Sequence, residues 1–160
     1  MNTPLVTLTP VGMVRSPIRE VRDEIFGGVV ARIELDATRF TPQALLGLEM
    51  FSHVEVFFLF DQVRESEVVN QTRHPRNRVD WPKVGIFAQR ARMRPNRMGA
   101  TVCRLVGVEG LSVSVEDLDA IDGTPVLDLK PWMQVMGPRG AVREPAWALE
   151  LAGTYWRPPK

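Results

Sequence analysis

Four arginines stand close together in the stretch RARMRPNRMG, residues 90–99 of this 160-residue chain. They are Arg90, Arg92, Arg94 and Arg97. Like charges at this spacing repel one another, so the run predicts a site for an anion, and the forked guanidinium group suits carboxylate or phosphate. The alternative is a basic surface turn whose arginines pair with acidic neighbours, because Pro95, Asn96 and Gly99 are typical turn residues.

The basic residues of the chain are unevenly distributed. Residues 73–97 hold eight Lys or Arg against Asp80 alone, whereas the remainder holds twelve basic and eighteen acidic residues. The net charge of +1 therefore conceals a basic block on an acidic body. Such a block favours an anionic partner, and Lys83 with the arginines at 73, 76 and 78 could attract a nucleic-acid backbone.

A second polar stretch, EDLDAIDGTPVLDLKPW, occupies residues 116–132. Asp122-Gly123 is by itself a common turn signal, but the stretch carries more carboxylates than a turn needs: Asp117, Asp119, Asp122 and Asp128. Motifs for dinucleotide, P-loop, zinc-protease and hydrolase-elbow sites are absent. The single cysteine, Cys103, excludes an internal disulfide and a cysteine metal cluster, and we expect a buried structural thiol and no metal site.

The elements that must hold these stretches are mostly short strands, separated by turns rich in the 12 Gly and 13 Pro. We predict strands within residues 5–18, 29–35, 53–61, 83–89, 99–110 and 111–117, and short helices after Pro42 and over 145–152. The apolar run HVEVFFLFD at 53–61 predicts a strand buried on both faces. Gly27 and Gly28 permit a bulge or a close approach. This pattern predicts a mainly β fold, either a barrel or a sandwich.

Four segments together resemble the TsaA-like (TrmO, YaeB-like) family: PVGMVRSPI, LLGLEMFSHVEVFFLFD, VGIFAQRARMRPNRMGATVCRL and DAIDGTPVLDLKPW. The resemblance runs from about residue 10 to residue 132, and its specificity lies in the pair RPN…G and DGTPVxDxKP. It implies a dimeric, single-domain β-barrel over residues 1–160, with one or two short helices, long loops and a C-terminal extension over 133–160.

The resemblance also implies S-adenosylmethionine as cofactor and tRNA as partner. The best-known members methylate N6 of a modified adenosine at position 37 of tRNA. Matched by motif, the cofactor would contact Asp61, Gln62, Arg90, Leu118, Asp119, Ala120 and Ile121, with Gly27 and Gly28 as looser matches.

An exocyclic adenine amine is a poor nucleophile, because its lone pair is delocalised into the ring. Under the resemblance, Asn96, Asp122 or a backbone carbonyl of the DGTP turn would accept its N–H, and Asp122, Asp128 or water could take the proton that methyl transfer releases. Arg94, with Arg90, would bind an anionic group of the acceptor or cofactor.

The chain also departs from the family pattern. AQRARMRPNRMG replaces the usual ATRSxxRPNPIG, and only 28 residues follow KPW, where the bacterial enzymes continue into a C-terminal domain. A different acceptor, or a cofactor-binding protein without catalysis, therefore remain alternatives. No apolar run approaches the roughly 20 residues that span a bilayer, and the first residues lack a signal-peptide pattern. We expect a cytoplasmic protein without membrane or DNA partners.

Overall fold

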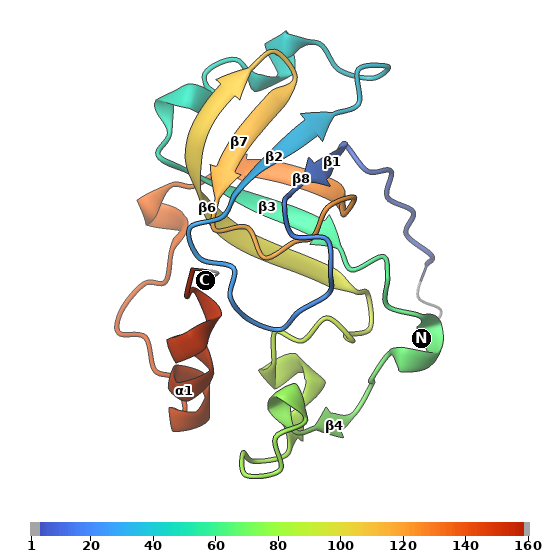
Figure 1. The fold of residues 1–160 in the computed structure, drawn as a ribbon, viewed down its shortest axis with the longest axis vertical. Coiled ribbons are helices and arrows are strands. Elements are labelled where there is room, and N and C mark those ends of the chain that lie inside the picture. Colours follow the sequence, from blue (N-terminus) through green and yellow to red (C-terminus); the bar gives the residue numbers. More distant parts are fainter. Residues whose placement is uncertain (1–3, 159–160) are drawn as a thin grey trace.

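The computed structural model describes residues 4–158 of the chain, so both ends of the expected domain 1–160 lie outside the described residues. Six strands form a closed barrel in the order β1-β2-β7-β6-β3-β8 (Figure 1). They are β1 (Gly12–Arg15), β2 (Val30–Leu35), β3 (His53–Leu59), β6 (Met98–Glu109), β7 (Ser112–Glu116) and β8 (Pro125–Pro131). Every neighbouring pair is antiparallel. The predicted β-barrel is confirmed.

Apolar side chains from all six strands fill the barrel. Ile33, Val56 and Val113 are fully buried there, and Cys103 lies among them as the expected buried thiol. The prediction that the strand at 53–61 is buried on both faces is wrong. In β3 buried residues alternate with half-buried ones, because a barrel has a single interior and the outward face of the strand is only partly covered.

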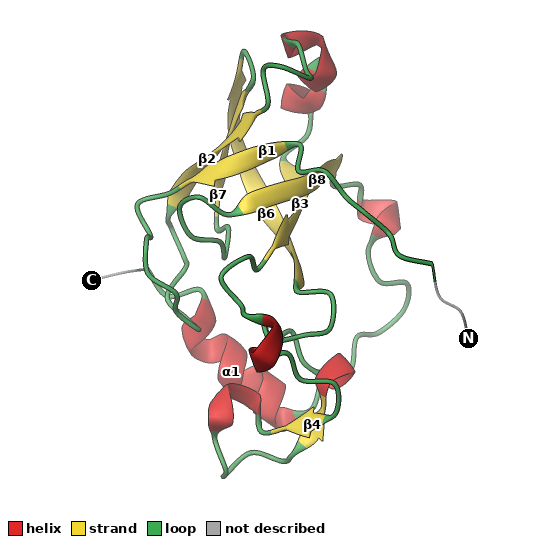
Figure 2. Ribbon diagram, turned by 90° about the vertical axis from the view of Figure 1, so that its right-hand side faces the viewer, coloured by secondary structure: helices red, strands yellow, loops and turns green. Residues whose placement is uncertain are grey.

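The remaining elements are short and lie mainly at one end of the barrel. They include β4 (Thr72–Arg73) paired with β5 (Val84–Gly85), and the helix α1 (Ala146–Tyr155). Single 3-10 turns cover Pro42–Leu45, Leu48–Met50, Glu65–Glu67, Pro75–Asn77, Ile86–Ala88 and Gln134–Met136. In Figure 2 the barrel strands occupy the upper part of the molecule, with α1 and β4 below them. No helix among residues 4–158 has the length and apolarity needed to cross a membrane.

Two local predictions need correction. The strand expected over 83–89 ends at Gly85, and a 3-10 turn follows, because the side chain of the buried Gln89 donates to the Val84 carbonyl at 3.1 Å, which lies out of its reach in an extended chain. The helix expected after Pro42 is reduced to two 3-10 turns, because Gly47 between them has a φ of +86°. The short helix expected over 145–152 is confirmed as α1.

The antiparallel topology brings several connections to the same end of the barrel. The chain leaves β1, β3 and β7 at this end, and it enters β2, β6 and β8 there. We call residues 16–28, 60–97, 117–124 and 138–158 the loop-rich end. The loop before β6 and the loop after β7, which carry most of the first polar stretch and part of the second, therefore lie at the same end, although β6 (12 residues) and β7 (5 residues) separate them along the chain.

Candidate functional site

A pocket of about 280 Å³ lies where the loop-rich end meets the barrel. Its walls come from the connection after β1, the end of β3 with the residues that follow it, the loop before β6 and the segment between β7 and β8. The volume is close to the lower end of the roughly 300–1,000 Å³ found for small-molecule pockets. The pocket is thus built by segments that are distant in sequence and joined by the barrel.

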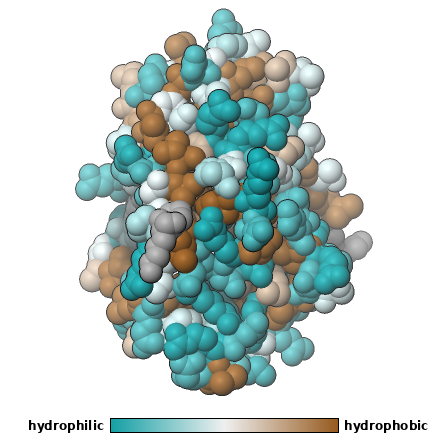
Figure 3. Space-filling model, viewed as in Figure 1, coloured by the Kyte–Doolittle hydropathy of each residue, from teal (hydrophilic) through white to brown (hydrophobic). Residues whose placement is uncertain are grey.

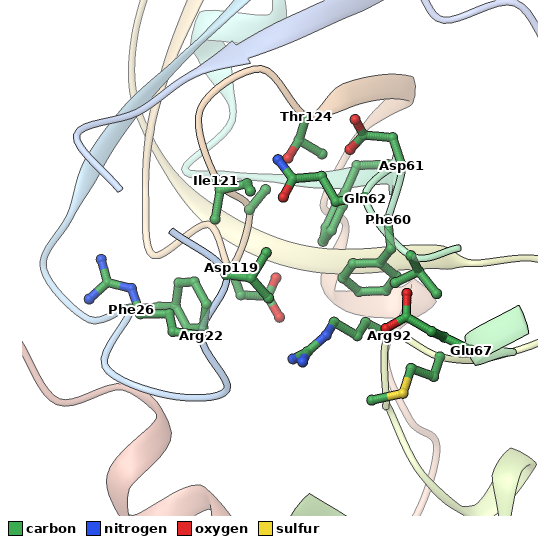
Figure 4. A pocket seen from close by; sticks show the side chains of 15 residues that line it. Arg22, Phe26, Phe60, Asp61, Gln62, Glu67, Arg92, Asp119, Ile121 and Thr124 are labelled. Atoms are coloured by element: carbon green, nitrogen blue, oxygen red, sulfur yellow. The ribbon is translucent and has the colours of Figure 1, made fainter. Parts of the chain in front are cut away.

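The pocket combines aromatic, acidic and basic side chains. Its lining includes Phe26, Phe58, Phe60, Asp61, Gln62, Glu67, Arg22, Arg92, Asp119, Ala120, Ile121 and Thr124. Figure 4 shows the labelled side chains around a central hollow, with Phe60 on one side and Ile121 with Phe26 on the other. Such a lining can hold a ligand that has a flat ring, a cationic group and a carboxylate.

Asp119 is held firmly at the wall of the pocket. The Thr101 hydroxyl donates to one of its oxygens and the Tyr155 hydroxyl donates to the other. Thr101 comes from β6 and is buried, whereas Tyr155 is the last residue of α1. Burial of the Tyr155 hydroxyl, reinforced by the Asp119 charge, raises the pKa of Tyr155 well above its usual range. Tyr155 therefore remains a hydrogen-bond donor to the carboxylate.

Two arginines line the pocket from opposite elements. Arg92 forms an ion pair with Asp23, which ties the loop before β6 to the connection after β1. Arg22 lies over the ring of Phe26, with 5.5 Å between the guanidinium carbon and the ring centroid. The Nε of Arg22 is buried and has no hydrogen-bond partner within residues 4–158. A buried donor without a partner is costly, so this atom is suited to a bound acceptor.

Of the nine residues predicted to bind cofactor, five line this pocket: Asp61, Gln62, Asp119, Ala120 and Ile121. The other four are placed elsewhere by the fold. Leu118 is buried in the barrel core. A Cβ on Gly27 would lie 1.8 Å from the carbonyl oxygen of Trp156, so the close approach at this glycine is made by the chain itself. The Gly28 N–H donates to Asp117 Oδ1 at 2.7 Å.

The arginine-rich run is bonded mainly to the protein itself. Arg90 donates to the carbonyl of Ala100, Arg94 to that of Gln89 at 3.1 Å and Arg97 to that of Val63 at 2.7 Å. Among the four, Arg92 alone lines the pocket. The run thus acts largely as a set of clamps that shape the loops around the site, since each guanidinium satisfies a backbone carbonyl or a carboxylate.

The three residues predicted for catalysis lie near the pocket but outside its lining. Asn96 is exposed. Asp122 is half-buried, and its Oδ1 accepts the Ser16 N–H at 3.0 Å. No hydrogen bond to the other carboxylate oxygen of Asp122 occurs within the described part of the chain. Arg94 is half-buried on the loop that carries Arg92. Asp122 directly follows the pocket residue Ile121 in the sequence.

Sequence reasoning missed several pocket residues, notably Arg22, Phe26 and Phe60, and it placed Arg92 in the anion-binding run but not among the cofactor contacts. Phe60 precedes the predicted Asp61 and could have been found from that neighbour. Arg22 and Phe26 belong to a connection with no motif, and nothing in their local sequence indicates a pocket. Residues 4–158 contain no group of three or more His, Cys, Asp or Glu side chains placed to hold a metal ion.

The fold and sequence match known proteins over more than half of the chain. A crystal structure of TrmO from P. aeruginosa superposes with a TM-score of 0.73 and 30% identity, covering 91% of this chain and 63% of that one. A probable S-adenosyl-L-methionine-binding protein of Pyrococcus abyssi is 32% identical over 143 residues, which is 87% of this chain and 74% of that protein. The mouse tRNA (adenine(37)-N6)-methyltransferase is 41% identical over 90 residues, 56% of this chain and 20% of that protein.

The chain thus spans only part of the length of the methyltransferases that it matches. The family model for the N-terminal domain of tRNA-methyltransferase O matches residues 21–137. That range contains β2 to β8, all fifteen pocket residues and both polar stretches. On its sequence and its barrel, the chain belongs to the tRNA-methyltransferase O N-terminal domain family.

Proposed function

We propose that this protein is an S-adenosylmethionine-dependent methyltransferase that acts on N6 of adenosine 37 of tRNA. The observation that carries the proposal is the pocket, which combines aromatic rings, carboxylates and an unpartnered buried arginine donor. The names of the relatives support both the cofactor and the tRNA acceptor of the proposal, since they include tRNA (adenine(37)-N6)-methyltransferases and S-adenosyl-L-methionine-binding proteins.

The residues present fit the chemical groups of this cofactor. Phe26 and Phe60 provide apolar faces for an adenine ring, and Asp119 provides carboxylate oxygens for ribose hydroxyls or the amino group. Arg22, with its free Nε, is the natural partner for the methionine carboxylate. Asp61 and Glu67 bring negative charge that favours a cationic ligand. A hydrogen bond from the backbone N–H of Arg64 is the main cause that lowers the pKa of Glu67, so Glu67 is charged at neutral pH.

The cofactor would supply a methyl group activated by a positively charged sulfur. The protein would then align the adenine N6 with that methyl group, because transfer is an in-line displacement that depends mainly on positioning. The free carboxylate oxygen of Asp122 or the amide oxygen of Asn96 would accept an N–H of the amine and so make its lone pair available. As the N–C bond forms, the bond between the methyl carbon and the sulfur would break and leave a neutral thioether, and one N–H proton would pass to Asp122 or to water.

A tRNA acceptor agrees with the charges that remain unpaired. Arg73, Lys83, Arg90 and Arg94 form no ion pair with an acidic side chain among residues 4–158. They belong to the same loop-rich end as the pocket, so an RNA backbone bound to them would lie near the transferred methyl group. Arg94, with Arg90, is proposed to bind a phosphate or the carboxylate of the modified nucleoside.

The test has two stages. Calorimetry with S-adenosylmethionine should detect binding to the wild-type protein and weaker binding to Arg22→Ala, with Arg19→Ala, a nearby exposed arginine outside the pocket, as the matched control. Labelled cofactor is then offered with tRNA from a strain that lacks the modification, and label should appear in N6-methyladenosine. Absence of binding at millimolar cofactor would contradict the whole proposal, and binding without transfer would contradict the tRNA part.

We propose in addition that the protein is a cytoplasmic homodimer. Support for self-association comes from apolar side chains on the outside of β2 and β6, where Val30, Val102 and Val106 are 49%, 37% and 47% exposed. Figure 3 shows a strip of apolar surface left of centre on an otherwise mostly hydrophilic face. Light scattering should give twice the chain mass, and Val102→Glu should shift it toward the monomer, whereas the exposed Val79→Glu should not. Cell fractionation tests the location.

A further inference from the structure

The C-terminal helix α1 is bonded to the pocket through its last residues. The backbone N–H groups of Ile25 and Phe26 both donate to the carbonyl of Tyr155 at 3.0 Å, and the Gly27 N–H donates to the carbonyl of Arg157 at 3.2 Å. Three consecutive residues of the connection after β1 are therefore attached to the end of α1. This connection also carries the pocket residues Arg22 and Phe26.

Side chains strengthen the same junction. Glu24 accepts the Thr154 hydroxyl at 2.6 Å and pairs with Arg76 at 3.0 Å, so α1, the connection after β1 and the loop after β4 meet at one carboxylate. The Tyr155 ring packs on Phe26 with 5.5 Å between centroids. Gly27 has no room for a side chain, because the Trp156 backbone occupies that space. The end of α1 is thus fitted closely against the pocket wall.

We propose that Tyr155 is a positioning residue for the proposed cofactor site, through its hydrogen bond to Asp119. The inference rests on the proposed function. The Asp119 side chain has three staggered χ1 rotamers. The hydroxyls of Thr101 and Tyr155 together stabilise the rotamer that faces the pocket. The family model ends at residue 137, so Asp119 lies inside the part of the chain that the family match covers and Tyr155 lies outside it. The pocket is then completed by residues of the C-terminal segment.

The environment of the Tyr155 hydroxyl supports this role. Asp119 is its hydrogen-bond acceptor, Arg76 lies 5.8 Å from the ring centroid, and the positive charge of Arg90 acts on it as well. Burial and the Asp119 carboxylate raise the pKa of the hydroxyl more than the two arginines lower it. The hydroxyl is therefore protonated at every pH at which the protein would function, and its donation to Asp119 is constant.

The contact can be measured without any ligand, because Tyr155 is the only tyrosine of the chain. Phenolate absorbance during an alkaline titration reports on this residue alone, while circular dichroism verifies that the protein stays folded. In the wild type the phenolate should form at least one pH unit above the ordinary value of about 10. Asp119→Asn should lower that midpoint, whereas Glu150→Gln, a charge removal elsewhere on α1, should leave it unchanged. A midpoint near 10 in the folded wild type would overturn the proposal.

The effect on the site is measured by calorimetry with S-adenosylmethionine. Tyr155→Phe keeps the ring on Phe26 and removes only the hydroxyl, so it should weaken binding roughly three- to tenfold, the loss expected for a hydrogen bond to a charged group that acts indirectly. Leu149→Ala, an exposed change on α1, should bind as the wild type does. Both variants are measured well below their melting temperatures, so that a lower stability of either does not change the measured affinity.

The outcomes separate the two proposals. Equal affinities of the wild type and Tyr155→Phe overturn the positioning role, even if the protein binds the cofactor well. No binding by the wild type overturns the proposed function, and the positioning role falls with it even if the tyrosine titration confirms the Asp119 contact. Two results together support the inference. The midpoint of the tyrosine titration is raised in the wild type and falls in Asp119→Asn, and of the two α1 variants compared by calorimetry only Tyr155→Phe binds S-adenosylmethionine more weakly.

Discussion

The barrel and the loop-rich end are stabilised by different interactions. The barrel is closed by antiparallel strand pairs and filled with aliphatic side chains that are almost completely buried. The loop-rich end has a small apolar cluster around Ile18, Phe26 and Val29, and otherwise depends on arginines bonded to carbonyls and on aromatic contacts. Apolar burial is insensitive to orientation, whereas each of these polar contacts requires a defined geometry.

Because of this difference, we expect substitutions in the two regions to affect different properties of the protein. Substitutions in the barrel should lower the free energy of unfolding of the whole molecule, because its core is shared by all six strands. Substitutions in the loop-rich end should act on local segments that can open while the barrel stays folded. The pocket lies where the two regions meet, with a rigid wall from β3 and an adjustable wall from the loops.

The largest effect is expected inside the barrel. Ile33 is fully buried, so Ile33→Ala should lower the free energy of unfolding by about 2–5 kcal/mol through lost burial and the cavity left behind. Denaturant unfolding measures the change. Arg32→Ala on the same strand is the control, because the Arg32 side chain is 61% exposed and its replacement should cost about 0.5 kcal/mol or less. Similar losses for the two variants would show that the barrel interior is not the main source of stability.

A smaller and local effect is expected at the junction with α1. Gly27→Ala would place a Cβ 1.8 Å from the Trp156 carbonyl oxygen, so the end of α1 must move, at a cost of about 1–3 kcal/mol. Hydrogen exchange should show lost protection in residues 138–158 with little change in β3 or β6. Gly153→Ala in α1 meets no atom within 4 Å and should protect the helix slightly better. Uniform loss of protection across the barrel in Gly27→Ala would contradict the expectation that the loop-rich end opens while the barrel stays folded.

Trp81 tests a single polar contact in the loop-rich end. Its indole N–H donates to Glu150 of α1 at 2.7 Å, while its ring is buried beside Trp147. Trp81→Phe keeps an aromatic ring and removes the donor, so it should cost about 1 kcal/mol. The melting temperature should fall by a few degrees, and Trp156→Phe, at a ring that is 44% exposed, should lower it less. An equal change in both would argue against a role for this hydrogen bond.

The smallest effect concerns pH. The Thr154 hydroxyl is the main cause that lowers the pKa of Glu24, and Arg76 adds to it. Because the folded value lies below the unfolded one, this stabilisation is present above the unfolded pKa and is lost as the pH falls through the folded pKa. Glu24 is 42% exposed, so the contribution should be under about 1 kcal/mol. The difference in stability between wild type and Glu24→Gln should shrink on acidification, and a difference that grows would contradict this account.

Local pattern was enough to predict most of the barrel. Strands at 29–35, 99–110 and 111–117 were expected from alternating apolar residues, because a barrel wall has one inner and one outer face. The strand predicted at 53–61 is present as β3, and only its predicted burial on both faces is wrong, because its outer face also carries apolar residues. At 83–89 the strand prediction fails after Gly85, where a buried glutamine bonded to the carbonyls of Arg73 and Val84 requires a turn. Hydrogen bonds between distant segments are not visible in a local pattern.

The candidate site was predicted in part. Asp61, Gln62 and the residues at 119–121 line the pocket, because they follow strands that end on the same side of the barrel. Arg90 was expected to contact the cofactor, but its side chain is bonded to the Ala100 carbonyl and lies outside the lining. Arg92, which the family pattern does not contain, is a pocket residue. Which arginine of a run faces a cavity depends on the loop conformation, and charge spacing does not determine it.

By itself, the sequence determined a mainly β fold and the two polar stretches, because these depend on short-range patterns of apolar, turn and charged residues. The choice of a barrel over a sandwich came from the family resemblance, and the strand β8, which closes the barrel between β3 and β1, was not predicted. Only the tertiary structure decided how the site is completed. Tyr155 meets Asp119 across 36 residues, and Arg92 meets Asp23 across 69. Such pairings arise when the barrel closes and the loops pack at its end, and their partners are chosen by distance in space rather than by spacing along the chain.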